Sequence, residues 1–144
     1  MKMPDVNVLI YAHRADDPAH AFYAKWLDNT VNGPAAFALS VLSVTAFVRI
    51  VTNARFPAAP TDLEQAISFV EVLSSAPNCR WVGVGPSNWA VVRDLCRATK
   101  TRGPTISDAQ HAAVAIENGC TLVSRDPDFR RFERHGLSFM LLEP

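Results

Sequence analysis

Four aspartates stand next to short apolar segments of the chain, where their carboxylates could act together. They are Asp5, Asp108, Asp126 and Asp128. Carboxylates that meet at one edge of a sheet repel one another unless a cation neutralises them. Such oxygen ligands suit Mg²⁺, and Mn²⁺ can replace it. The pattern predicts a divalent-metal site, and a metal beside clustered acids indicates phosphate chemistry.

Two polar side chains are spaced to support these acids. Asn7 follows Asp5 by two residues and Ser124 precedes Asp126 by two, so either could orient a carboxylate or a metal-bound water. Each aspartate alone also has a structural explanation. Asp108 in the first turn of a helix is favoured by the helix dipole, and Asp126 before a proline is common at a helix start. The site hypothesis therefore depends on the aspartates occurring together.

The elements that must position these residues alternate between short apolar strands and helices. We expect strands at 2–4, 36–39, 80–84, 121–123 and 137–142, and helices at 6–12, 19–32, 43–52, 61–75, from about 87, and from about 107 to 118. This alternation predicts a three-layer α/β fold, in which helices flank a central, mostly parallel sheet of about five short strands. Sites in such sheets form at the carboxyl ends of strands.

Local signals refine the helices. The segments 61–64 and 107–110 have the spacing of capping boxes, so Thr61 and Ser107 are expected to cap their helices. Trp89 is expected on a buried stripe together with Val92 and Leu95. Asn118–Gly119 is expected to end its helix in a left-handed cap.

The composition restricts the class of protein. A chain of 144 residues with 49% hydrophobic and 19% charged residues predicts a single globular domain, 1–144. Its 14 basic and 14 acidic residues cancel, which argues against a general nucleic-acid coat but not against a local groove. Three cysteines, no signal-peptide pattern and no apolar run near ~18 residues predict a soluble, cytoplasmic protein with reduced thiols.

Three segments, in order, resemble motifs of the PIN domain family. Residues 3–9 are similar to its opening motif, in which the first strand ends in Asp-x-Asn. Residues 107–113 resemble its Asp-Ala start of an alanine-rich helix, and residues 119–129 its Gly-x-x-Leu-Val-(Ser/Thr)-x-Asp-x-Asp-Phe segment. Residues 47–53 resemble a middle segment of the VapC toxin branch. The resemblance runs nearly from end to end.

The resemblance implies a Mg²⁺-dependent endoribonuclease, the toxin of a VapBC-type toxin–antitoxin module, that hydrolyses RNA phosphodiester bonds with a metal-activated water. It implies Asp5, Asp108 and Asp126 as catalytic metal ligands, with Asn7, Ser124 and Asp128 as possible supporting residues. It also implies a VapB-like antitoxin and a homodimer as partners. One departure is Ala46, which stands where the family generally carries a glutamate; no acid occurs between Asp28 and Asp62. That leaves room for one well-held metal.

Two other functions compete with this one. The missing acid at Ala46 also suits a non-catalytic PIN-fold module that binds RNA. A response-regulator receiver domain ranks third, because it needs a paired acid where Asn7 stands, an aspartate in 82–85 and a late lysine, whereas no lysine follows Lys100.

Two groups of basic residues flank the predicted site and are interpreted either as solvated surface or as contacts to the RNA backbone. One group is Arg97, Lys100 and Arg102; the other is Arg125, Arg130, Arg131 and Arg134. The histidines share no metal-ligand spacing. His111, one turn after Asp108, is interpreted as a helix-packing or surface residue that could touch the site.

Overall fold

A five-stranded parallel sheet organises the chain. The computed structural model describes residues 1–144. The strands are β1 (Lys2–Pro4), β2 (Phe37–Ser40), β3 (Cys79–Val82), β4 (Thr121–Ser124) and β5 (Ser138–Leu141), in the spatial order β3-β2-β1-β4-β5. Every neighbouring pair is parallel. The prediction of a mostly parallel sheet of about five short strands is confirmed, and all carboxyl ends lie at one edge.

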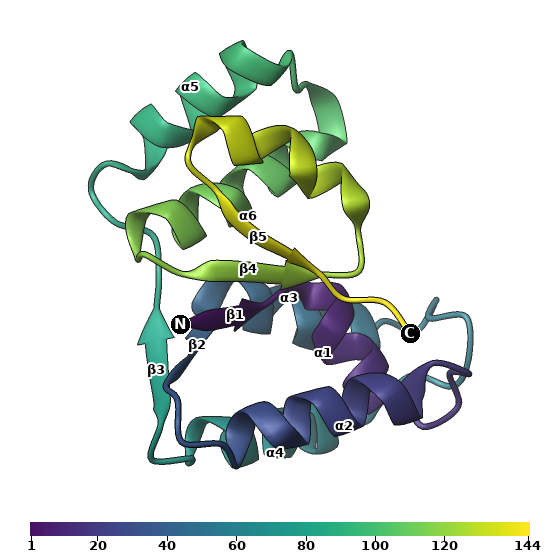
Figure 1. Ribbon diagram of the computed structural model, residues 1–144. Coiled ribbons are helices and arrows are strands. Elements are labelled where there is room, and N and C mark those ends of the chain that lie inside the picture. The colour runs from purple at the N-terminus through teal and green to yellow at the C-terminus, as the bar shows by residue number, and fades with distance from the viewer.

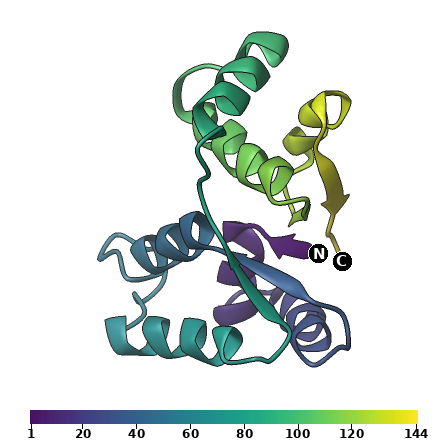
Figure 2. The ribbon, with the colours of Figure 1, turned by 90° about the vertical axis from the view of Figure 1, so that its left-hand side faces the viewer.

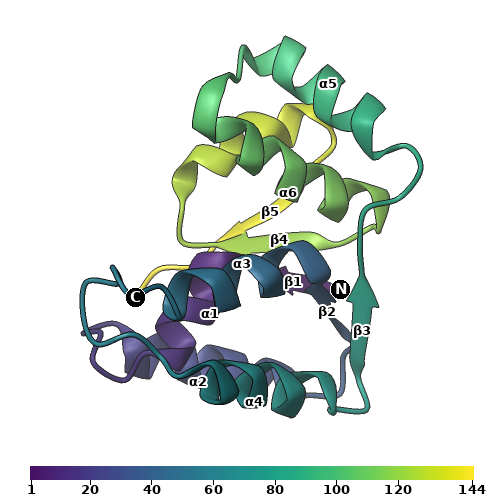
Figure 3. The same cartoon turned by 180° about the vertical axis from the view of Figure 1, so that it is seen from behind.

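Helices cover both faces of the sheet. They are α1 (Val6–His13), α2 (His20–Val31), α3 (Val41–Val51), α4 (Leu63–Ser74), α5 (Asn88–Thr99) and α6 (Ile106–Glu117), with two 3₁₀ helices, η1 (Gly103–Thr105) and η2 (Pro127–His135). In Figure 1 and, from behind, in Figure 3, α5, α6 and η2 lie above β4, whereas α1, α2 and α4 lie below it. None of the helices has the length and apolarity that crossing a membrane requires.

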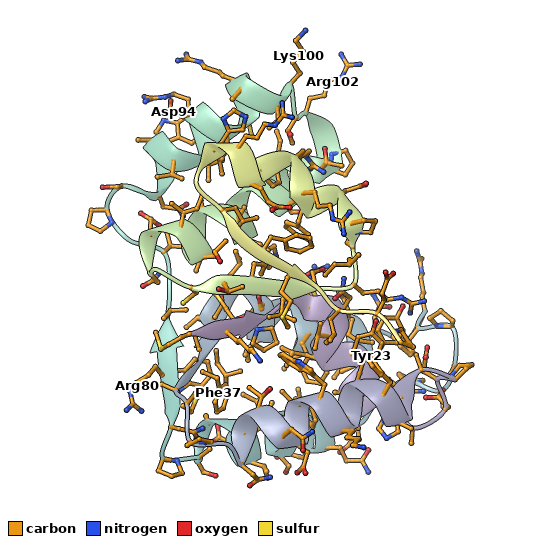
Figure 4. The ribbon with its side chains drawn as sticks, in the orientation of Figure 1. Tyr23, Phe37, Arg80, Asp94, Lys100 and Arg102 are labelled. Carbon is orange, nitrogen blue, oxygen red and sulfur yellow. The ribbon has the colours of Figure 1, made fainter.

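The core is divided between these two faces. Phe37 and Leu39 of β2 belong to the cluster built with α1 to α4, whereas Ala38 between them belongs to the cluster built with α5, α6 and η2. Successive residues of a strand point to opposite faces, so a short apolar strand buried on both sides serves both clusters. Figure 4 shows Tyr23 and Phe37 in the lower layer, where the Tyr23 hydroxyl donates to the Leu142 carbonyl oxygen at 2.9 Å.

Both predicted capping boxes are wrong. Asp62 and Thr105 occupy the N-cap positions of α4 and α6, and neither side chain makes a capping hydrogen bond. Ser107 lies inside α6, where its hydroxyl donates to the Pro104 carbonyl oxygen at 3.0 Å. The side chain of Thr61 is instead within hydrogen-bond distance, 3.1 Å, of the His13 ring. The predicted left-handed cap at Gly119 is confirmed by its φ of +63°.

The predicted buried stripe of α5 is wrong at Trp89, whose side chain is 70% exposed. Its neighbour Asn88 is buried in its place and donates to Oε2 of Glu117 at 3.0 Å. This bond ties the start of α5 to the end of α6. Figure 2 shows the strand that leads to α5, β3, as the outer edge of the sheet, and Figure 4 shows Arg80 pointing outward from it.

Candidate active site

Asp5 and Ser124 meet because β1 and β4 are neighbours in the sheet. The backbone N–H of Asp5 donates to the Val123 carbonyl oxygen at 2.8 Å and thus continues the β1–β4 ladder past the end of β1. Ser124 ends β4, and its hydroxyl donates to Oδ2 of Asp5 at 2.7 Å. Both side chains are buried. One carboxylate of the predicted site is therefore fixed by the sheet itself.

The Ser124 hydroxyl connects three of the predicted residues. It accepts from Nδ2 of Asn7 at 3.0 Å and from the backbone N–H of Asp126 at 3.1 Å. Oδ1 of Asn7 in turn accepts from the backbone N–H of Arg125 at 3.2 Å. Ser124 thus contacts both Asp5 and Asp126, and Asn7 reaches these acids only through the Ser124 hydroxyl.

Asp126 and Asp128 have different positions on η2. Asp126 is the N-cap of this helix, and its Oδ1 accepts from the backbone N–H of Asp128 at 2.9 Å. The side chain of Asp126 also lines the pocket at the carboxyl edge of the sheet. Asp128 is exposed and does not line this pocket. The geometry therefore favours Asp126 over Asp128 as a site residue.

Asp108 enters the same region from α6. It lies in the first turn, where the helix dipole favours a negative charge. Its Oδ2 accepts from Nη2 of Arg131 at 3.1 Å, which is the only ion pair made by any of the predicted site aspartates. Arg131 also donates through Nη1 to the Asp128 carbonyl oxygen at 3.0 Å.

A pocket of about 310 Å³ joins these side chains, and Asp5, Asn7, Asp108, His111 and Asp126 line it. A larger hollow of about 940 Å³ lies around the carboxyl end of α1, near His13 and Arg14. None of the predicted site aspartates lines that hollow. Because the smaller pocket is where the carboxylates converge, it is the candidate active site.

Burial shifts the titration of two groups in this pocket. Desolvation raises the pKa of the Asp5 carboxyl above its ordinary value, against the opposing effects of His111 and of the Ser124 hydrogen bond. Desolvation lowers the pKa of His111, against the attraction of Asp5 and Asp108. An ionised Asp5 is thus incompletely compensated by the protein, and a cation in the pocket would stabilise it.

His111 is a pocket residue that the sequence interpretation assigned mainly to packing or surface. Its side chain is buried, its Nδ1 lies 3.2 Å from Oγ of Ser43, and it lines the pocket beside Asp108. The signal was present in the sequence, since residues one turn apart on a helix share a face.

Ala46 also lines this pocket, from α3. The position at which a fourth acid is missing therefore faces the other acids. Arg49, one turn further along α3, lines the pocket as well. The pocket wall formed by α3 thus contributes the apolar side chains of Ala46 and Ile50 and the cation of Arg49, and no carboxylate.

The donor chemistry of the pocket fits a hard divalent cation. Asp5, Asp108 and Asp126 all contribute carboxylate oxygens to it, which Mg²⁺ and Mn²⁺ prefer. No three acidic, histidine or cysteine side chains lie close enough to share an ion in this arrangement. Two of the carboxylates have other partners, Arg131 on Asp108 and the Asp128 N–H on Asp126. A shared cation therefore requires a rearrangement of these side chains.

Most of the basic residues predicted to flank the site lie apart from it. Figure 4 shows Lys100 and Arg102 projecting from the molecule beyond the end of α5. Arg125 stacks on Tyr11, with 4.6 Å from its guanidinium carbon to the ring centre. Arg97 and Arg130 are exposed. Of the predicted basic residues, only Arg131 contacts a site aspartate.

Known proteins resemble the chain in sequence and in fold. The profile described as PIN domain matches residues 2–135. Ribonuclease VapC25 of Mycobacterium tuberculosis is 36% identical over 132 residues, which cover 92% of this chain and 93% of the relative. VapC ribonuclease Mb2897 of Mycobacterium bovis is 38% identical over 130 residues, which cover 90% and 88%.

Solved structures agree with this fold. VapC20 of Mycobacterium tuberculosis, described as a sarcin-ricin loop cleaving toxin, superposes with a TM-score of 0.71 at 14% identity and covers all of both chains. VapBC2 from Rickettsia felis gives a TM-score of 0.71 at 16% identity, over 99% of this chain and 98% of the other. The chain belongs to the PIN domain family, in the branch of the VapC ribonucleases.

Proposed function

We propose that the protein is an endoribonuclease, the toxin of a VapBC-type module, and that it hydrolyses RNA phosphodiester bonds with the help of a divalent cation. The observation that carries this proposal is the buried Asp5, which shares one pocket with Asp108 and Asp126 at the carboxyl edge of the sheet. The relatives at 36% and 38% identity are named as ribonucleases, which supports the same activity.

In this proposal Asp5, Asp108 and Asp126 would hold Mg²⁺, which Mn²⁺ could replace. A bound cation would act as a Lewis acid on a phosphate oxygen and would lower the pKa of a water. Ser124 holds the acids in place, because its hydroxyl contacts both the Asp5 carboxylate and the Asp126 backbone, and Asn7 donates to the same hydroxyl. Groups that orient metal ligands in this way contribute to metal affinity and to activity.

Cleavage of structured RNA by the purified protein with Mg²⁺ or Mn²⁺ tests the enzyme. Removal of either carboxylate by Asp5→Asn or Asp108→Asn should lower the rate by about 10²–10⁴-fold. Asp94→Asn is the matched control, since Asp94 is an exposed surface residue on α5 (Figure 4) and should keep full activity. Cleavage that survives both site variants would refute the proposed site.

A non-catalytic RNA-binding protein is the second candidate, and the position of Ala46 in the pocket wall favours it. The same assay separates the two functions. A binder retains RNA on a filter with or without Mg²⁺ and leaves it intact, whereas an enzyme produces new ends only with the cation.

The exposed arginine next to Arg131 is proposed to contact the RNA backbone. Arg130→Glu should weaken RNA binding and lower the slope of log affinity against log salt by about one unit per lost phosphate contact. Arg80→Glu is the control, because Arg80 points outward from the β3 edge (Figure 4). Equal slopes for the two variants would remove Arg130 from the interface.

We also propose a VapB-like antitoxin and a second copy of this chain as partners, acting in the cytoplasm. Solved relatives of the same fold are VapBC complexes from Rickettsia felis and Salmonella typhimurium. Leu63 and Ile67, exposed apolar side chains one turn apart on α4, offer a surface for such contacts. Co-expression with a short neighbouring reading frame, followed by light scattering, tests the complex and the stoichiometry of this chain.

A further inference from the structure

Arg131 is the one cation that directly contacts a carboxylate of the pocket. Its Nη2 donates to Oδ2 of Asp108 at 3.1 Å, and the two side chains are 27% and 25% exposed. A guanidinium on a carboxylate oxygen occupies a lone pair and places a positive charge where a divalent cation would bind. The contact therefore occupies one oxygen of a carboxylate that the proposed function assigns to metal binding.

The Asp108–Arg131 contact is suited to exchange. One nitrogen of Arg131 bonds to Asp108, and a second donates to the Asp128 carbonyl oxygen at 3.0 Å. The guanidinium lies over the Phe132 ring, with 4.4 Å from its carbon to the ring centre. If the bond to Asp108 opens, the Asp128 carbonyl and Phe132 still hold Arg131 near the pocket. Water also reaches both partners, so neither charge would be left buried without a partner.

We propose that Arg131 and a divalent cation compete for Oδ2 of Asp108, so that Arg131 must release this oxygen before the cation is held by both Asp5 and Asp108. This inference rests on the proposed metal dependence. Arg131 then acts as a positioning residue: it holds the Asp108 carboxylate in place, and it sets how much cation is needed to displace the guanidinium.

Mn²⁺ binding, measured by calorimetry at low salt, tests the competition. An internal cation that occupies the site lowers the apparent affinity for Mn²⁺, because only the fraction of the protein with a free site can bind it. Arg131→Met should therefore bind Mn²⁺ about three- to tenfold more tightly than the unmodified chain. Arg130→Met loses the same charge from an exposed neighbour, and its affinity should stay within about twofold because such charges are screened. Equal affinities for the two variants, or weaker binding by Arg131→Met, would overturn the proposal.

Thermal unfolding separates competition from a merely structural role. In EDTA, Arg131→Met should melt below the unmodified chain, because the Asp108 pair is lost. In saturating Mn²⁺ this gap should narrow, since a ligand stabilises the form that binds it more tightly. A gap that is the same in EDTA and in Mn²⁺ would assign Arg131 a structural role and overturn the competition.

Asp5→Asn distinguishes failure of this inference from failure of the proposed function. If Mn²⁺ binding does not depend on Asp5, the proposed metal site is wrong, whatever Arg131→Met does. If it depends on Asp5 but not on Arg131, only the competition is wrong. If Arg131→Met binds Mn²⁺ and the unmodified chain shows no measurable binding, the competition is supported. If neither protein binds Mn²⁺, both the metal site and the competition are overturned.

Discussion

The two sides of the pocket hold their carboxylates by different means. On the sheet side, Asp5 is buried at the end of β1, and its partner Ser124 is buried at the end of the neighbouring strand. On the helix side, Asp108 is partly exposed and is held by Arg131, a long side chain from η2. One carboxylate is placed by the backbone of a sheet and the other by an ion pair that water can reach.

This difference indicates that the two carboxylates respond differently to a cation. A hydroxyl that donates to a buried carboxylate leaves the negative charge in place, so Asp5 still attracts a cation. A guanidinium on Asp108 neutralises the charge and must be exchanged. We therefore expect loss of the Ser124 hydroxyl to alter activity and stability strongly, and loss of the Arg131 guanidinium to alter mainly the cation concentration that is needed.

Removal of the shared hydroxyl gives the largest effect among these tests. Ser124→Ala deprives Asp5 of its donor and the Asp126 N–H of its acceptor. RNA cleavage should fall by about 10–100-fold, and the free energy of unfolding by about 1–3 kcal/mol because buried polar groups lose partners. Ser138→Ala is the control, since its hydroxyl makes an exposed contact with Thr121. Similar activities for the two variants would mean that Ser124 does not position the acids.

A glutamate at position 46 on α3 would add a fourth acid to the pocket. Ala46→Glu puts a carboxylate into the pocket wall and should raise Mn²⁺ affinity by about tenfold, because ligand charge tunes such affinities. In EDTA the same variant should be less stable, since like charges repel. Thr45→Glu, on an exposed neighbour, is the control. If both variants bind Mn²⁺ alike, Ala46 does not face the cation.

The smallest predicted effect is a difference in protein stability between the Asp5→Asn and Asp108→Asn variants, measured in EDTA. Burial raises the pKa of Asp5 above 3.8, so the folded state holds its proton more tightly and stability falls as pH rises above 3.8. Asp5→Asn removes this cost and should raise the free energy of unfolding at pH 7 by about 0.5–2 kcal/mol. The gain should shrink as pH falls toward 3.8.

Asp108→Asn should show no such gain, because it leaves Arg131 without its carboxylate. Chemical denaturation of both variants across this pH range provides the measurement. A similar gain in stability for Asp5→Asn and Asp108→Asn would contradict the contrast.

The sequence was sufficient for the sheet side of the site. The apolar segments that end at Asp5 and Ser124 are strands, and parallel neighbours place their ends at one edge. The motif order then predicted which aspartates converge. Asp108 was also predictable, because a carboxylate in the first turn of an alanine-rich helix points to the same edge.

The helix side depends on tertiary placement, which local patterns do not encode. Arg131 was one of several similar arginines, and only the path of η2 brings it to Asp108. Trp89 was misplaced because α5 begins so that Asn88 faces inward, and one residue rotates a helix face by about 100°. Thr61 was misassigned as a cap because its hydroxyl contacts His13 instead.

Anomalous diffraction from crystals grown with Mn²⁺ tests the central claim most directly. The account predicts a peak in the pocket of about 310 Å³, within coordination distance of both Asp5 and Asp108, with Arg131 no longer bonded to Oδ2 of Asp108. A pocket without a peak at saturating Mn²⁺, or a peak there while the Asp108–Arg131 bond stays intact, would contradict it.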